Sequence, residues 1–287
     1  MSKKSRRERE ERERRKEKRF DLKTIWAILS VFLILGLIGM TAFQQMEIRE
    51  LKEKTLSPDL GELERLRDSV VILRFQREIP ETKEIKVKFG LGVVIEENGQ
   101  KYIVSLYHIL SNGGKLNIDF LQKYLKVYLG SGVGKGRELE LRTNPGVDLV
   151  VYKLPKDLNY SPMPIGNSDD LEIGQQVFLI GFPWTDEIIV REGIIGATKS
   201  PKETMAFIQK DGNTELGEND IIVLSYIGSP GDSGGPILTF DDGKLKMIGI
   251  HKGHRGVRIG EEIAPTMSWG IKINPILSHT RELIKRF

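Results

Sequence analysis

The sequence contains no cysteine, and this absence excludes three kinds of chemistry at once. Disulfide bonds, zinc sites built from cysteine and a cysteine nucleophile are all ruled out. The absence also argues against a small secreted domain that disulfides hold together. At 287 residues the chain is instead long enough to be stabilised by a hydrophobic core.

Net charge is nearly absent outside the first 24 residues. Residues 1–24 carry 12 basic and 6 acidic side chains, a net charge of +6, whereas the rest of the chain carries −2. The larger part has no positive excess that would attract nucleic acid, and no nucleic-acid partner is expected. Residues 1–24 have too little apolar surface to fold alone and are expected to be disordered or a solvated helix. A basic nucleic-acid-binding arm is the alternative, which the interleaved acids disfavour.

A single long apolar run, residues 25–43, lacks any charge over 19 residues. A helix of that length approaches the hydrocarbon thickness of a bilayer, and Trp26 fits an interfacial anchor. A buried core helix is disfavoured because the run is apolar on all faces. A cleaved signal peptide is disfavoured because Met40 and Ala42 fit its cleavage site poorly. We therefore predict one transmembrane helix that anchors the chain.

The basic residues before this run set its expected orientation. By the positive-inside rule, residues 1–24 form a cytoplasmic tail and the part after the anchor is extracytoplasmic. Residues 44–68 are charged, and Pro58 and Gly61 interrupt any long helix, so a stalk is predicted there. The chain is therefore expected to be a single-pass membrane protein whose main domain, residues 69–287, lies outside the cytoplasm.

Residues 69–287 have the sequence pattern of an all-β domain. Short runs rich in β-branched and aromatic residues alternate with Gly, Pro, Asn and Asp, as in a sandwich or a pair of barrels. A helix is expected at the end, from Asn274 to Arg286, because Asn274 can cap it and Pro275 is tolerated at its first position.

The most specific motif is Gly-Asp-Ser-Gly-Gly-Pro at residues 231–236. A nucleophilic serine needs a tight turn and nearby backbone N–H groups that stabilise an oxyanion, and glycines allow both. A plain glycine-rich hairpin loop is the alternative, which is improbable for this hexapeptide. Ser233 is therefore the candidate nucleophile.

A serine needs a base within hydrogen-bond reach, and the base needs a carboxylate that orients it. The chain has four histidines, and His108 ends the β-type run YIVSLYHIL. Asp148 stands at the entry of the apolar strand DLVVYKL. A core histidine and a turn aspartate are the alternatives for these two residues. Their order along the chain, His108, Asp148 and then Ser233, is that of chymotrypsin-type enzymes.

These residues stand in a sequence that resembles the protease domain of the HtrA/Deg family of trypsin-like serine peptidases, without its PDZ module. The resemblance covers residues 70–275 and rests on the stretches GLGVVI, YIVSLYHIL, NPGVDLVVYKL, PIGNSDDLEIGQQVFLIGFP, VREGIIGA, SPGDSGGPIL, MIGIHKG and SWGIKI. It implies two packed six-stranded antiparallel β-barrels with a boundary near residues 155–170. His108 and Asp148 would come from the first barrel and Ser233 from the second.

Two of the departures from the family concern the domain organisation and the nucleophile loop. Only 54 residues follow Ser233, too few for a PDZ module after the last strands. Asp232 stands where HtrA-type proteins usually have Asn. In trypsin-like enzymes this Asp pairs with a new N-terminus made by cleavage, but no activation site is evident here, so Asp232 has no assigned partner.

The resemblance implies a serine endopeptidase that works through an acyl-enzyme without metal or organic cofactor. The backbone N–H groups of Gly231 and Ser233 would form the oxyanion hole. The substrate pocket would involve Ile227, Ile250 and Gly270, which predicts a preference for apolar P1 residues. Expected substrates are unfolded or exposed protein segments, with a role in quality control of exported proteins, and a homo-oligomer is left open.

Three other interpretations are compatible with the sequence. The first is a catalytically silent pseudoprotease that binds proteins at the membrane. The second is a metal site at His251 and His254, whose spacing suits two ligands but lacks further partners, so HKGH is expected in a loop beside the cleft. The third is phosphate binding by residues 130–136, GSGVGKG, where the glycine spacing is one short and no Ser or Thr follows the lysine.

Overall fold

The computed structural model describes residues 3–54, 60–78, 82, 84–110, 125–129, 139–183, 187–259 and 262–287. The chain separates into two compact units, Met1–Ser57 and Pro58–Phe287. The glycine-rich segment 130–136 lies outside the described residues.

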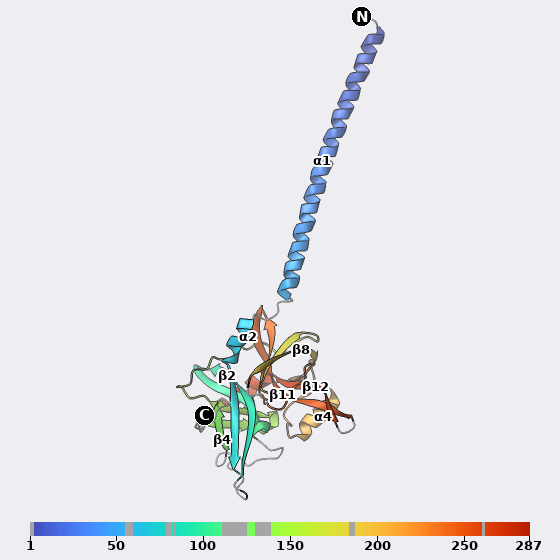
Figure 1. Ribbon diagram of the computed structural model, residues 1–287. Coiled ribbons are helices and arrows are strands. Elements are labelled where there is room, and N and C mark those ends of the chain that lie inside the picture. Colours follow the sequence, from blue (N-terminus) through green and yellow to red (C-terminus); the bar gives the residue numbers. More distant parts are fainter. Residues whose placement is uncertain are drawn as a thin grey trace. The chain divides into compact units, whose positions relative to one another are not determined.

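The first unit consists of helix α1, Lys3–Lys54, which is 52 residues long (Figure 1). Its described large apolar side chains are exposed, from 49% for Ile25 to 70% for Met46. Among the residues that the structure describes, no helix meets the combined requirement of length and apolarity for crossing a membrane.

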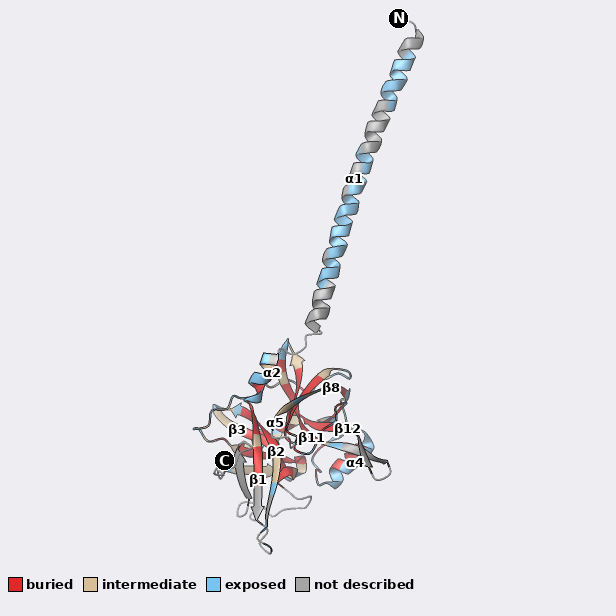
Figure 2. Cartoon of the chain, viewed as in Figure 1, coloured by how far each residue is buried: buried red, intermediate tan, exposed pale blue. Residues whose placement is uncertain are grey.

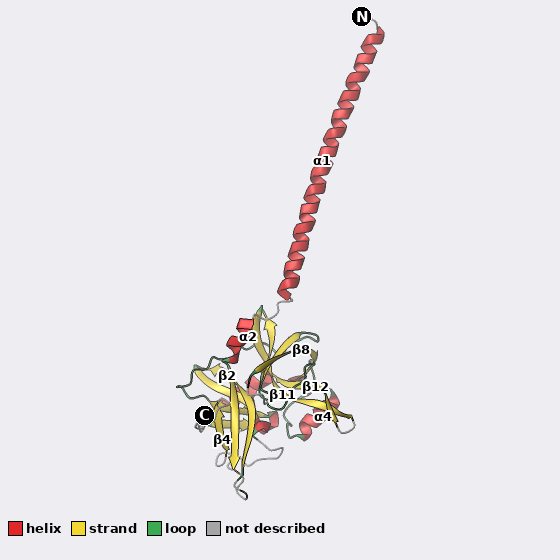
Figure 3. Cartoon of the chain, in the orientation of Figure 1, coloured by secondary structure: helices red, strands yellow, loops and turns green. Residues whose placement is uncertain are grey.

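The second unit is mostly β, as predicted, and contains two antiparallel sheets (Figure 3). The first sheet has six strands in the order β4-β1-β2-β3-β6-β5. The described part of this sheet shows no pairing between its edge strands β4 and β5, so its predicted closure into a barrel stays a prediction. Its strands are β1 Val70–Glu78, β2 Ile85–Glu97, β3 Gln100–Leu106, β4 Leu125–Leu129, β5 Leu141–Asn144 and β6 Leu149–Lys153.

The second sheet is a closed six-stranded barrel in the order β10-β11-β12-β9-β8-β7, which confirms one of the two predicted barrels. A β-bulge shifts the register of β11 and β12 between His251 and Gly253. Its strands are β7 Gln176–Gly181, β8 Ile189–Ala197, β9 Ile221–Leu224, β10 Pro236–Asp241, β11 Lys244–Ile259 and β12 Glu262–Lys272.

Two tight hairpins follow directly from the sequence. Asn98 and Gly99 join β2 to β3 with φ of 52° and 74°, and Asp242 and Gly243 join β10 to β11 with φ of 51° and 72°. Two-residue turns with positive φ at both positions match the twist of antiparallel strands, and Asn-Gly and Asp-Gly are the pairs that adopt them most readily.

One apolar cluster contains residues of both sheets, so the sheets share a core, while a second cluster lies within the barrel (Figure 2). Strand β2 contributes Leu91 and Val93, and the barrel contributes Ile180 and Leu238, each fully buried. The backbone N–H of Leu91 also donates to the Ser233 carbonyl at 2.8 Å. This hydrogen bond links the first sheet directly to the nucleophile loop.

Helices of the described part of the chain also belong to the body. α2, Leu60–Arg67, buries Leu63 and Leu66 in the core, so this part of the predicted stalk packs on the body. α4, Lys202–Lys210, lies between β8 and β9 in the chain and was not predicted. The segment HKGH, predicted to be a loop, lies within strand β11.

The C-terminal helix is confirmed as α5, Ile273–Ile284, with a corrected start. Lys272 and not Asn274 is its N-cap residue. The backbone N–H of Asn274 donates to the Ser168 hydroxyl at 3.1 Å, and its side-chain amide donates to Asn167 at 2.8 Å. Tertiary contacts, which the local sequence does not reveal, therefore satisfy the first turn of the helix.

Candidate active site

His108 lies where β3 ends and turns into the 3-10 helix η1, Tyr107–Ile109. Its neighbours Tyr107 and Ile109 are buried, while the imidazole is 39% exposed. The backbone N–H of His108 donates to Asp148 Oδ1 at 2.7 Å. The apolar neighbours thus fix the turn and leave the ring at an accessible edge of the first sheet.

Asp148 follows the 3-10 helix η2, Pro145–Val147, and precedes β6. Its φ of 60° is a left-handed conformation, which Asp and Asn adopt more readily than most residues. The Asn144 side chain accepts from Gly146 at 3.0 Å, and the Asp148 carbonyl accepts from Tyr107 at 3.0 Å. The turn places the carboxylate directly beside His108.

Ser233 lies in the loop between β9 and β10. Gly231 and Gly234 take positive φ values of 100° and 89° on either side of it. A Cβ on Gly234 would overlap the Leu91 carbonyl oxygen. The Gly234 N–H also donates to the His251 carbonyl at 3.0 Å. Glycine is therefore required where the loop packs against β2.

The three predicted triad residues come together at the junction of the two sheets. His108 Nδ1 is 2.7 Å from Asp148 Oδ2, and His108 Nε2 is 3.1 Å from Ser233 Oγ. An ionised carboxylate can only accept hydrogen bonds, so the proton of a neutral His108 is on Nδ1. The lone pair on Nε2 then faces the Ser233 hydroxyl.

The electrostatics of Asp148 favour its ionised form. Burial alone would raise the pKa of Asp148, but His108 and Lys252 beside it hold that pKa well below its usual range. The carboxylate is only 1% exposed and accepts from both groups through Oδ2. The site thus contains a permanently charged acceptor behind the imidazole.

The N–H groups predicted for the oxyanion hole lie in the same loop. In the part of the chain that the structure describes, the backbone N–H groups of Gly231 and Ser233 donate to no protein acceptor. Asp232 between them donates to the Ser229 carbonyl at 3.1 Å.

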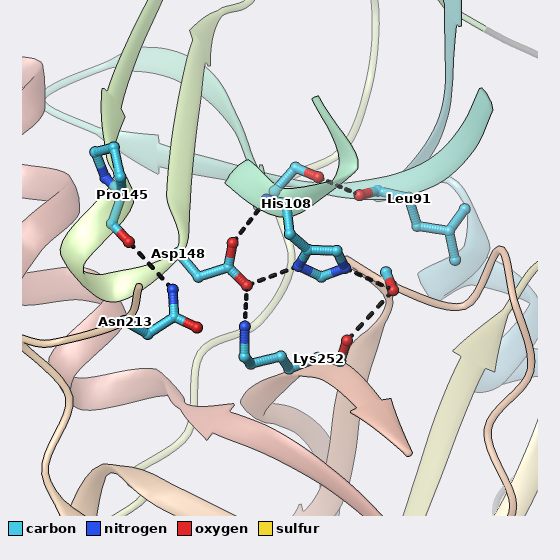
Figure 4. Close-up of polar contacts among 8 residues, drawn as sticks. Leu91, His108, Pro145, Asp148, Asn213 and Lys252 are labelled. Carbon is cyan, nitrogen blue, oxygen red and sulfur yellow. Dashed lines mark hydrogen bonds and ion pairs between the residues drawn. The ribbon is translucent and has the colours of Figure 1, made fainter. Parts of the chain in front are cut away.

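Lys252 is a further residue of this site, which the sequence did not single out. Its Nζ donates to Asp148 Oδ2, and its backbone carbonyl accepts from the Ser233 hydroxyl at 3.3 Å. Figure 4 shows the ammonium, the carboxylate and the His108 ring in one group. The signal in the sequence was a lysine inside the apolar strand MIGIHKG.

Asp232 has a partner that the sequence did not reveal. Arg191 of β8 donates through Nη1 to Asp232 Oδ2 at 2.5 Å and through Nη2 to Ser229 Oγ at 3.2 Å. Asp232 is fully buried, and burial raises its pKa although Arg191 and the Ser229 backbone lower it. A single arginine in the strand IIVREGIIGA was the available signal. The ion pair ties the residue before the nucleophile to the barrel wall.

The residues predicted for the pocket have different surroundings. Ile227 is 53% exposed, whereas Ile250 is fully buried in the core. Gly270 lies opposite His251 on the neighbouring strand, and its Cα faces the Ile237 side chain. Their joint role as a substrate pocket stays a prediction.

The two histidines of the alternative metal site differ in their surroundings. His251 is 1% exposed with its Nδ1 3.3 Å from the Tyr226 hydroxyl, whereas His254 is exposed. Over the described residues, the structure holds no group of three or more His, Asp or Glu side chains arranged to bind a metal ion.

Comparisons with known proteins agree with this geometry. A probable periplasmic serine endoprotease DegP-like of Chlamydia pneumoniae is 29% identical over 178 residues, which are 61% of this chain and 30% of that protein. Serine protease HTRA4 of Mus musculus is 29% identical over 194 residues, or 66% of this chain and 35% of that protein. The chain thus spans about a third of the length of these curated relatives.

A solved structure, the HtrA-type protease AlgW with a tripeptide, has the same fold. It superposes with a TM-score of 0.58 at 20% identity over 79% of this chain and 64% of that one. The sequence pattern of the trypsin-like peptidase domain matches residues 90–250, more than half of the chain. The chain therefore belongs to the trypsin-like peptidase domain family.

Proposed function

We propose that this protein is a serine endopeptidase that hydrolyses peptide bonds through an acyl-enzyme, with His108, Asp148 and Ser233 as its catalytic triad. The observation that carries the proposal is the unbroken contact from Asp148 Oδ2 to His108 Nδ1, at 2.7 Å, and from His108 Nε2 to Ser233 Oγ, at 3.1 Å. The serine endoproteases among the relatives support the same reaction.

The reaction follows from the proton positions. Ser233 Oγ attacks the peptide carbonyl carbon as its proton passes to His108 Nε2, and Asp148 stabilises the imidazolium. When the tetrahedral intermediate collapses, the C–N bond breaks and the leaving amine takes the proton from Nε2. A water molecule then attacks the acyl-enzyme, with His108 again as base, and releases the carboxylic acid and free Ser233.

The oxyanion that forms in each half-reaction needs donors already in place. The backbone N–H groups of Gly231 and Ser233 are free of protein acceptors in the described part of the chain, which supports their assignment as the oxyanion hole. The Arg191–Asp232 pair lies next to both donors and supports the loop that bears them. No cofactor takes part in this scheme.

Covalent labelling tests the proposal. A fluorophosphonate should react with Ser233 in the full-length chain, as mapped by peptide mass, and Ser233→Ala should stay unlabelled. A wild-type chain that is folded but unreactive at every pH would support the alternative of a silent protein-binding module.

The proposed substrates are unfolded or exposed protein segments, with a preference for apolar P1 residues. The exposed Ile227, next to the nucleophile loop, supports an apolar subsite, since it offers no charge to a basic P1 residue. The periplasmic endoproteases among the relatives support a role in quality control of exported proteins. Cleavage of a peptide library only after Arg or Lys would refute the preference.

We also propose that residues 25–43 anchor the protein in a membrane, with residues 1–24 in the cytoplasm and residues 69–287 outside it. The run lies in helix α1, whose described large apolar side chains are exposed. Exposed apolar side chains on an uncharged helical stretch favour contact with lipid. A reporter at the C-terminus that proved cytoplasmic would refute this topology.

A further inference from the structure

Lys252 contacts two members of the triad from strand β11. Its ammonium donates to Asp148 Oδ2, the same oxygen that His108 Nδ1 approaches at 2.7 Å. Its carbonyl oxygen is 3.3 Å from Ser233 Oγ and offers the hydroxyl a second acceptor beside His108 Nε2. The side chain is only 7% exposed, so its charge is little screened by water.

The shared oxygen has an electrostatic consequence. In the proposed reaction Asp148 stabilises the imidazolium that forms when His108 takes the serine proton. A second cation on Asp148 Oδ2 divides the attraction of that carboxylate and repels the imidazolium. Like charges within about 4–6 Å disfavour the charged form of a titratable group.

The other titratable groups around His108 do not reproduce this effect. Tyr107 precedes it on η1, and burial raises the pKa of this phenol. His251 approaches from β11, and burial lowers its pKa to about 3. Both are neutral near pH 7. The Arg191 cation, which also acts on His251, is paired with Asp232. Asp148 and Lys252 are the charged groups that meet at the oxygen beside His108.

We propose that Lys252 is a positioning residue of the triad that fixes the Asp148 carboxylate and lets His108 act as a base at lower pH than a triad without this cation. The inference rests on the proposed peptidase function. Lys252 makes two contributions. Its hydrogen bond orients the Asp148 carboxylate, and its charge sets the pH range over which His108 acts as a base.

The test is the rate of fluorophosphonate labelling of the full-length chain between pH 4.5 and 9. Lys252→Met removes both the charge and the hydrogen bond, and Lys252→Gln keeps a donor without the charge. Both variants should raise the midpoint of the pH–rate profile by about one unit, and Lys252→Met should lose more of the maximal rate. Lys252→Arg keeps the charge and should stay near the wild-type midpoint.

Lys246→Met is the matched control, because Lys246 belongs to the same strand but pairs with Asp241. The midpoint of the pH–rate profile of this variant should equal that of the wild type. An unchanged or lowered midpoint in folded Lys252→Gln or Lys252→Met would overturn the inference while Ser233 still reacts. Failure of the proposed function would look different, since the wild type would then not be labelled at any pH. Thermal unfolding of each variant confirms that the fold is kept, and Lys252→Gln, which retains a donor for Asp148, provides the answer if Lys252→Met unfolds.

Discussion

Replacing Arg191 with Met should loosen the nucleophile loop, because it leaves the buried carboxylate of Asp232 without its cation. Arg191 lies 2.5 Å from Asp232 and is 19% exposed, whereas Asp232 is completely buried. The Ser229 N–H, at 2.6 Å, would be the main remaining donor to the same oxygen. The charge would then be compensated only by the backbone groups of Ser229 and Phe182.

Removing one partner of a buried ion pair costs about 3–5 kcal/mol of folding stability. The partial exposure of Arg191 admits some water, so a loss near the lower end, about 3 kcal/mol, is expected at pH 8. The variant escapes part of this cost when Asp232 takes up a proton. Burial already raises the pKa of Asp232, and loss of Arg191 removes a group that lowers it. The deficit should therefore shrink as the pH falls from 8 to 5.

Denaturant unfolding at pH 8 and pH 5 measures this effect in a double-mutant cycle. Arg191→Met/Asp232→Asn removes both charges and should be more stable than Arg191→Met alone at pH 8. Labelling of Ser233 should slow in Arg191→Met and recover in part in the double variant. Lys246→Met, which breaks an ion pair at the surface, should change stability far less. Additive effects of the two substitutions, or a deficit below about 1 kcal/mol at pH 8, would refute the reasoning.

Two further predictions concern glycine geometry and a buried histidine. Gly234→Ala should lower the free energy of unfolding by more than about 2 kcal/mol and abolish labelling, because its Cβ would overlap the Leu91 carbonyl. Gly243→Ala, where φ is also positive but the space is open, should lower it by only about 1 kcal/mol. Equal losses in the two unfolding curves would contradict this. His251 is neutral in the fold, with a pKa lowered by burial to about 3, so its contribution to stability is present above pH 6.5 and is lost on acidification. The wild type should lose about 1.4 kcal/mol of folding free energy through His251 between pH 7.5 and 5.5, and His251→Gln should not show this loss. If denaturant unfolding of His251→Gln gave the same dependence on pH as the wild type, the prediction would be wrong.

The sequence was informative where function depends on short motifs. The hexapeptide at residues 231–236 and the order of His108, Asp148 and Ser233 were enough to predict the grouping that the structure displays. Tight turns with Asn-Gly and Asp-Gly and the apolar strands likewise follow from local preference. These features depend on residues that are close in the chain, or on a pattern shared with a family.

The supporting contacts were not predictable in the same way. Lys252 and Asp148 are 104 positions apart, and Arg191 and Asp232 are 41 apart, so only the barrel and its junction with the first sheet bring them together. Helix α4 was missed because its apolar residues form one short run, Met205–Ile208, which is too short to display helical periodicity.

The mass of the full-length chain after exposure to a fluorophosphonate tests the central claim most directly. The account predicts one adduct on Ser233 in the wild type, none in Ser233→Ala, and a strongly reduced rate in His108→Ala. A folded wild type without an adduct, or with equal labelling in His108→Ala, would contradict the assignment of His108 as the base that activates Ser233.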